Sequence, residues 1–290
     1  MTARPQPTAR RIGLGHELRA LRHKAGMTLA QAVDGLPFDT TTLQRVESGY
    51  RSFRQAGFLR ELLERYGITD EEEVERLLSL QREGSSREWW TGQESSLRSG
   101  MGRFLGAEAV AREIRGFHPV IVPGLLQTEA YARALHAMHN PVDAYPPGHI
   151  EYSVSTRLKR QEIFMRDVDP ARLWIILYEP ALRYRPAEPE AMRQQYEHIA
   201  AQAARGNVTI QVMPGGAQGY VAFQDIHIMN LHHGLPTTVV VDTAWFTVAV
   251  TDKPKEVERL SRMFDAMAAN ALPPGETPKI MAQLVGEIAP

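Results

Sequence analysis

Residues 18–49 constrain the fold of this chain more than any other stretch, because they place two turn signals between three short apolar-periodic segments. Gly26 separates the first two segments. Pro37 interrupts the chain before the third, since proline lacks a backbone donor and biases the residue before it towards extended geometry. Asp39 is a good N-cap for the third segment, and Gly49 is expected to end it. The spacing predicts three short helices joined by two tight turns.

This stretch resembles the helix-turn-helix domain of the lambda-repressor-like (Xre) family, and the two align without a gap. The positions at which that family keeps apolar, turn and motif residues are filled here by Leu18, Leu21, Gly26, Thr28, Leu36, Leu43, Arg45, Val46, Glu47 and Gly49. In such a domain the second helix of the motif lies in the major groove of DNA. The resemblance therefore implies binding to double-stranded DNA.

The third helix would present four side chains to DNA: Thr40, Thr41, Gln44 and Arg45. Of these, Thr40, Thr41 and Arg45 match by position the base-facing sites of the family. An arginine can clamp guanine through two hydrogen bonds, and a threonine can donate, accept or pack its methyl group on thymine. Arg45 has an alternative role, because an arginine late in this helix could instead bond a phosphate or Glu47.

Contacts with the DNA backbone are expected from Thr28, Arg51, Ser52 and Arg54. Such contacts fix the register of the protein on DNA and carry no sequence information. The alternative for the arginines is plain solvated surface. Leu29 departs from the family, which often has a phosphate-binding glutamine there. The missing contact would weaken DNA binding, or the arginines and the basic N-terminal arm would make a larger share of the phosphate contacts.

Arg22 and Glu47 occupy positions that, in this family, form an ion pair between the first helix and the end of the third. The resemblance implies a structural role for both. They are therefore not expected to contact DNA.

The composition of the chain is that of a soluble two-domain protein. Its 290 residues include no cysteine, which excludes disulfides and thiolate metal sites and suits a cytoplasmic location. No apolar run approaches the roughly 18 residues that a membrane span needs, and the polar N-terminus has no secretory h-region. Residues 1–66 hold 11 Lys/Arg against 6 Asp/Glu, whereas the rest holds 22 against 28. A basic N-terminal region followed by an acidic remainder suits an N-terminal DNA-binding domain, although such asymmetry also arises by chance.

Four regions follow from these patterns. We expect a flexible basic arm over 1–13, a helix-turn-helix domain over 14–83, a Gly/Ser-rich linker over 84–100 and a second domain over 101–290. Large aromatic side chains such as Trp89 and Trp90 are unusual in a solvent-exposed linker. We expect them to dock on the second domain or on a partner subunit, the alternative being loose exposure.

The second domain shows mixed periodicity. Strands are predicted over 117–122, 172–179, 208–213, 222–231 and 238–250, the last broken near 243. Helices are predicted over 103–115, 128–137, 149–166, 188–205, 253–270 and 276–288, with loops over 141–149 and 215–220. The fold class is thus an all-α helix-turn-helix DNA-binding domain followed by a larger, mixed α+β regulatory domain.

The second domain also carries a resemblance, centred on VIVPGLLQTEAYARAL at 120–135 and supported by RLKRQEIF, LWIILYEPALR, NVTIQVMP and MFDAMAANAL further on. These strings are similar to a domain of actinobacterial Xre-type regulators, including the antitoxin-like WhiJ group. The resemblance implies control by a small protein encoded beside the regulator, and nothing in the spacing indicates this. Candidate regulatory residues are Gln127, Glu179, Asp242 and Trp245. Asp242 stands where a glutamate is expected, so its reach is shorter.

Signatures of enzymes are absent from the sequence: it has no G-x-S-x-G elbow, no G-x-x-x-x-G-K-[ST] loop and no H-E-x-x-H. No catalytic residue and no cofactor are therefore expected. His232 and His233 are adjacent and would point apart on a strand, so even with His227 no metal site is predicted.

These patterns together predict a cytoplasmic, sequence-specific transcriptional regulator that binds an inverted-repeat operator as a homodimer. Its second domain would control binding through a small partner protein or a ligand. The alternative is an antitoxin-like interaction protein, whose main role is to bind a small cognate partner and whose DNA binding serves autoregulation.

Overall fold

The computed structural model describes residues 9–49, 51–53, 55–85, 100–167, 169–232, 235–242 and 247–288. The chain divides into two compact units, residues 1–110 with 231–236 and residues 111–230 with 237–290. Arg54, Trp89, Trp90 and Trp245 lie outside the described residues, so their predicted roles stay predictions. The predicted domain boundaries at 83 and 101 also stay predictions.

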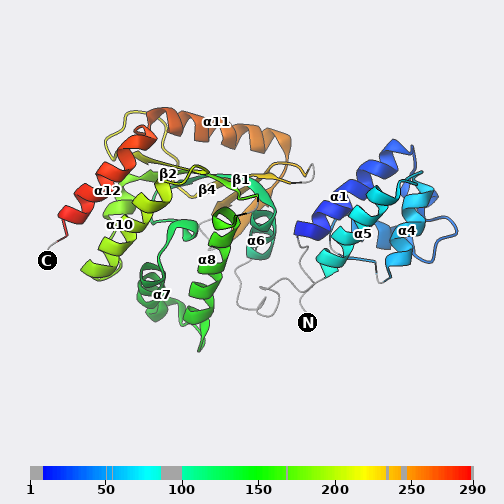
Figure 1. Ribbon diagram of the computed structural model, residues 1–290, viewed down its shortest axis with the longest axis horizontal. Coiled ribbons are helices and arrows are strands. Elements are labelled where there is room, and N and C mark those ends of the chain that lie inside the picture. The colour runs from blue at the N-terminus through cyan, green and yellow to red at the C-terminus, as the bar shows by residue number, and fades with distance from the viewer. Residues whose placement is uncertain are drawn as a thin grey trace. The chain divides into compact units, whose positions relative to one another are not determined.

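The first unit opens with a helical region (Figure 1), whose elements are α1 (Ala9–Lys24), α2 (Leu29–Val33), α3 (Thr40–Glu47), α4 (Ala56–Arg65) and α5 (Glu71–Ser85). One cluster of buried side chains joins them, including Leu18 of α1, Leu43 of α3, Leu62 of α4 and Leu77 of α5. The short helices are stabilised by this shared core, because isolated helices of such length are marginal in water.

α1 begins at Ala9, within the region 1–13 that is predicted as a flexible arm. Alanine and arginine are strong helix formers, and they extend the helix backwards from its first buried leucine, Leu14.

The rest of the chain alternates helices and strands. Its elements are α6 (Met101–Ala109), β1 (Ala111–His118), the 3-10 turn η2 (Gly124–Leu126), α7 (Glu129–Asp143), α8 (His149–Met165), β2 (Arg172–Tyr178), α9 (Glu179–Arg183), α10 (Pro189–Ala203), β3 (Val208–Met213), β4 (Ile226–Leu231), β5 (Thr238–Asp242), β6 (Val248–Thr251), α11 (Pro254–Asn270), η3 (Pro274–Glu276) and α12 (Thr277–Gly286). A helical helix-turn-helix region is therefore followed by a mixed α/β domain, as predicted.

The strands form one six-stranded sheet in the order β3-β2-β1-β4-β5-β6. β1, β2 and β3 are parallel, whereas β4, β5 and β6 pair antiparallel. Asn230, near the end of β4, donates to Glu113, near the start of β1. β4 therefore runs antiparallel to β1, and its start lies beside the end of β1.

Helices cover both faces of this sheet, with α11 on one side and α7, α8 and α10 on the other (Figure 1). The face beneath α11 is apolar, and Phe117 of β1 and Ile226 and Ile228 of β4 pack there against Phe264 and Met267 of α11. Because side chains alternate along a strand, the neighbours of these residues point towards the opposite face.

Two predicted elements are misplaced. The strand expected over 117–122 and the helix expected over 103–115 are replaced by α6, which ends at Ala109, and by β1, which spans Ala111–His118. Pro119 explains the shift, because a proline cannot donate to the ladder of a central strand. α7 also continues through Pro141 to Asp143, so the loop predicted to begin at 141 begins at Ala144.

The remaining predicted strands and helices lie close to their observed bounds, except that β4 starts at Ile226 rather than at 222. Of the helices described, none is long and apolar enough to span a membrane.

Candidate nucleic-acid interface

The helix α3 is closed at both ends by the residues that the sequence indicates. Asp39 Oδ1 accepts a hydrogen bond of 2.7 Å from the N–H of Thr42. The Thr42 side chain, followed by this N–H, lowers the pKa of the Asp39 carboxyl below its usual range. Gly49 adopts a φ of 75° just past the helix, and its N–H donates to the carbonyl of Val46. A positive φ is strained for other residues, so glycine suits this end of the helix.

One face of α3 is exposed and the other is buried. Thr40, Thr41, Gln44 and Arg45 are all exposed. Leu43 and Val46, which lie between them in sequence, are 0% and 1% exposed in the core of the unit. The four side chains predicted to read bases therefore share one solvent-facing surface of a helix whose opposite side is anchored.

Arg51 and Ser52 line a hollow of about 490 Å³ beside the start of α3, together with Pro37, Phe38, Asp39, Thr42, Phe53, Gln55 and Phe58. The N–H of Arg51 donates to the carbonyl of Arg45, which ties this segment to the end of α3. Ser52 Oγ is buried and has no hydrogen bond within the described part of the chain. Its hydroxyl would have to turn outwards to meet a phosphate.

Thr28 begins α2 with a capping box. Its Oγ accepts from the N–H of Gln31, and Gln31 Oε1 accepts from the N–H of Thr28. This arrangement satisfies two N–H groups at the start of the helix. Leu29 is partly buried against the core, so this position has no polar group to offer DNA. The hydroxyl of Thr28 is exposed but already engaged with its own helix.

The ion pair expected between Arg22 and Glu47 is present, and two hydrogen bonds join the guanidinium to the carboxylate. Arg22 Nε lies 2.7 Å from Glu47 Oε1, and Arg22 Nη2 lies 3.0 Å from Oε2. Both side chains are more than nine-tenths buried, and the carboxylate raises the pKa of Arg22. Arg22 also donates to the carbonyl of Met27 in the turn before α2. The pair therefore joins α1, the following turn and the end of α3, away from the exposed face.

Sequence reasoning missed Gly15, where α1 crosses the end of α3. A Cβ at this position would lie 2.4 Å from the carbonyl oxygen of Val46 and 2.7 Å from that of Glu47. The backbones thus approach each other where only glycine fits. The sequence does contain a signal for this contact, because a glycine inside a helical pattern often marks a place where another backbone packs closely.

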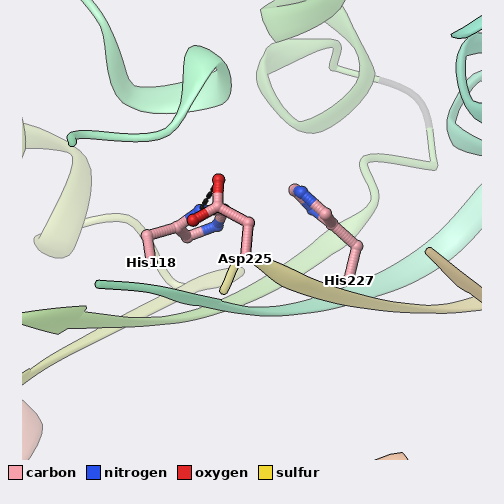
Figure 2. A group of neighbouring side chains, drawn as sticks. All are labelled: His118, Asp225 and His227. Atoms are coloured by element: carbon pink, nitrogen blue, oxygen red, sulfur yellow. Dashed lines mark ion pairs between the residues drawn. The ribbon is translucent and has the colours of Figure 1, made fainter. Parts of the chain in front are cut away.

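In the second unit, the structure brings together His118, Asp225 and His227 (Figure 2). One ligand atom from each lies within 4.8 Å of the others. Sequence reasoning paired His227 with His232 and His233 instead, and His233 lies outside the described residues. No local signal could have found this set, because more than a hundred residues separate His118 from Asp225.

The Gln127 side chain is buried and donates 2.7 Å to the carbonyl of Val122 within its own loop. Two further glutamines hold the same loop: Gln161 of α8 donates to the carbonyl of Gln127, and Gln195 of α10 donates to that of Leu126. Gln195 Oε1 also accepts 2.8 Å from the N–H of Thr128. The VPGLLQT string is therefore a loop fixed by buried amides, and Gln127 serves its internal structure.

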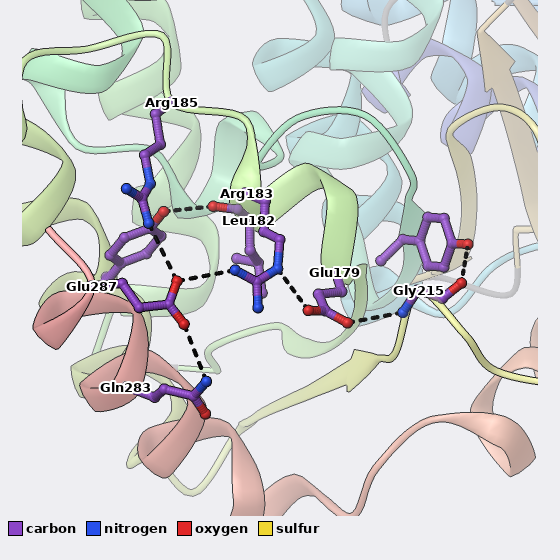
Figure 3. Close-up of polar contacts among 9 residues, drawn as sticks. Glu179, Leu182, Arg183, Arg185, Gly215, Gln283 and Glu287 are labelled. Atoms are coloured by element: carbon purple, nitrogen blue, oxygen red, sulfur yellow. Dashed lines mark hydrogen bonds and ion pairs between the residues drawn. The ribbon is translucent and has the colours of Figure 1, made fainter.

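Glu179 likewise organises a loop (Figure 3). Its Oε2 accepts 2.9 Å from the N–H of Gly215, and its Oε1 accepts 2.7 Å from Arg183. Arg183 Nη1 also donates 3.0 Å to Glu287 Oε2, and Gln283 Nε2 donates 3.1 Å to Glu287 Oε1. The bond from Gly215, followed by that from Arg183, lowers the pKa of Glu179. Glu179 thus fixes the loop after β3 to the end of β2.

Asp242 ends β5 and is exposed. Its N–H lies 3.4 Å from the carbonyl of Asp225, just before β4. The bonds given for Gln127, Glu179 and Asp242 run to three different segments, at Val122, Gly215 and Asp225.

Comparison with protein families gives two matches. Residues 13–77 match a helix-turn-helix domain, and residues 101–283 match a domain of unknown function, DUF5753. No curated protein and no solved structure matches the chain. The second match covers more than half of the chain. The chain therefore belongs to the DUF5753 family and carries an N-terminal helix-turn-helix domain in front of the family's domain.

Proposed function

We propose that this protein is a sequence-specific transcriptional regulator that binds an inverted-repeat operator as a homodimer. The observation that carries the proposal is the face of α3, on which Thr40, Thr41, Gln44 and Arg45 are exposed together above buried Leu43 and Val46. A helix anchored on one side and polar on the other can enter a major groove without rearranging its domain.

Arg45 and Arg51 would have different tasks. Arg45 would contact base edges, where a good bidentate pair contributes about 1–3 kcal/mol of discrimination. Arg51, tied to the end of α3 through the carbonyl of Arg45, would contact a phosphate. The hollow beside the start of α3 leaves room for the DNA backbone there.

The second domain would control DNA binding through a small partner protein or a ligand, and the protein would have no catalytic role of its own. The resemblance of its VPGLLQT string to antitoxin-like regulators supports control by a partner. Purification of the protein together with the product of a neighbouring small gene tests this part separately.

Fluorescence anisotropy with a duplex from the protein's own promoter region and a scrambled duplex of equal composition tests the DNA-binding part. We expect the wild type to prefer the promoter duplex, and its affinity to fall steeply with salt because phosphate contacts release counterions. Arg45→Ala should lose about tenfold to a hundredfold in affinity for the promoter duplex alone. Arg51→Ala should weaken binding to both duplexes equally.

Arg112→Ala provides the matched control, because it removes the same charge from an exposed position on β1 in the other unit. It should leave both affinities unchanged. Equal affinity of the wild type for promoter and scrambled duplexes would refute sequence-specific binding.

A further inference from the structure

The fold places His118, Asp225 and His227 on one face of the sheet, at the boundary between its parallel and antiparallel halves. β1 ends at His118, and Asp225 immediately precedes β4, which runs antiparallel beside β1. Phe117, Ile226 and Ile228 face α11, so the alternation of the strands turns His118 and His227 to the opposite side. Figure 2 shows the three side chains rising from the sheet into a common space.

The donor atoms are close enough for one ion. His118 Nδ1 lies 3.2 Å from Asp225 Oδ2, and a ligand atom from each of the three residues lies within 4.8 Å of the others. Two ligands at about 2.0–2.1 Å from a tetrahedral ion lie about 3.3–3.4 Å apart. The first pair therefore has the spacing of two zinc ligands, and His227 needs a small shift to complete the set.

The surroundings of His118 leave one nitrogen of its ring without a partner. The side chain is 1% exposed, Nδ1 faces Asp225 Oδ2 at 3.2 Å, and Nε2 has no hydrogen bond among the described residues. A buried polar group without a hydrogen bond is costly, so such a group calls for an explanation. Gly116 makes room for the ring, because a Cβ there would lie 2.8 Å from His118 Nε2.

The side chains of His118 and His227 are buried and that of Asp225 is 19% exposed, so the three donors lie in a space largely closed to water. The charge of Arg160 on α8 lies near His227 and would repel a cation there.

We propose that His118, Asp225 and His227 bind one divalent transition-metal ion of the zinc class. Imidazole ligands favour such ions over magnesium or calcium, which prefer oxygen. Three protein ligands leave a fourth position for water or for a group of another molecule. The ion would join the end of β1 to the start of β4 and so couple the two halves of the sheet.

Cobalt and zinc titrations of the full-length protein, stripped of metal with a chelator, test the proposal. The wild type should bind one Co²⁺ per chain with the intense visible absorption of a four- or five-coordinate site, and one equivalent of Zn²⁺ should displace it. Asp225→Asn and His227→Gln should lower the affinity for Zn²⁺ at least about tenfold. His139→Gln removes an exposed histidine of α7 and should bind as the wild type does.

Thermal unfolding provides a second measurement, because an ion that binds only the folded protein raises the melting temperature. Zn²⁺ should raise the melting temperature of the wild type and of His139→Gln, but not that of Asp225→Asn. The weak, six-coordinate spectrum of solvated Co²⁺ with the wild type would overturn the proposal even if the variants fail to fold. Unchanged zinc affinity in folded Asp225→Asn would overturn it as well.

Discussion

The two units of this protein place their polar side chains in opposite ways. In the first, the residues predicted to read bases are exposed on α3, above buried Leu43 and Val46. In the second, Gln195 is fully buried and bonds the N–H of Thr128, which lies 67 residues away in sequence. An exposed helical face follows from local pattern, whereas a buried amide is meaningful only once the chain is folded.

The Arg22–Glu47 pair is an exception to this contrast in the first unit, because it is polar, buried and long-range. Glu47→Ala should destabilise the first unit by about 3–5 kcal/mol, since it leaves the Arg22 charge buried without its partner. Hydrogen exchange of peptides from α1 and α3 measures the loss of protection.

Glu71→Ala is the matched control for Glu47→Ala, because it also breaks an Arg–Glu pair, with Arg60 at 2.9 Å. That pair is exposed at 40% and 68%, so water screens it and its loss should cost far less than the loss of the buried pair. Equal costs for the two variants would contradict the distinction between buried and exposed pairs.

Gly15 tests how closely α1 packs on α3. Gly15→Ala should destabilise the first unit by about 1–3 kcal/mol, because the added methyl meets two backbone carbonyls that cannot move independently. Gly57→Ala, in α4, is the control: a Cβ built there meets no described atom within 4 Å outside its own helix and chain neighbours, and alanine should stabilise that helix by up to about 1 kcal/mol. Urea unfolding measures both, and a neutral Gly15→Ala would show that the helices can separate at no cost.

Much of the first unit could be predicted from sequence, because its turns, caps and exposed face are local features. Asp39 caps α3 and Gly49 ends it, as their residue types indicate. In the second unit the strands with strong apolar runs were also found, and β3 was predicted at its observed bounds. β1 was misplaced because its alternating residues also fit a helix until Pro119 is weighed.

The sites of the second unit could not be predicted in the same way. Gln127 and Glu179 were selected by resemblance, and their regulatory roles stay predictions; the structure shows that they bond Val122 and Gly215. The His118–Asp225 pair depends on strand order, which no periodicity encodes. Physical reading of sequence thus finds surfaces built on one element and misses sites assembled from several.

The buried amides of the second unit provide a test of their own. Gln195→Ala should destabilise it by about 1–3 kcal/mol, because the carbonyl of Leu126 and the N–H of Thr128 lose their partner. Gln194→Ala removes an exposed amide from the preceding position of α10, where it bonds Glu190 across one turn, and should cost below about 0.5 kcal/mol. Hydrogen exchange of the loop around residue 126 should increase in the first variant alone.

The smallest expected effect is a pH dependence at Glu179. Its folded pKa is lowered, so it contributes stability above its unfolded pKa, about 4.3, and this contribution is lost as the pH falls through the folded value. Unfolding of the wild type should therefore become easier below about pH 4. Glu179→Gln should weaken this dependence and be slightly less stable at neutral pH, because the amide keeps only part of the contact with Gly215 and Arg183. Denaturant midpoints across pH 3–7, about the range in which carboxyl groups titrate, provide the comparison. Identical pH profiles for the two proteins would mean that this partly exposed carboxylate, unlike the buried Glu47, contributes nothing to stability.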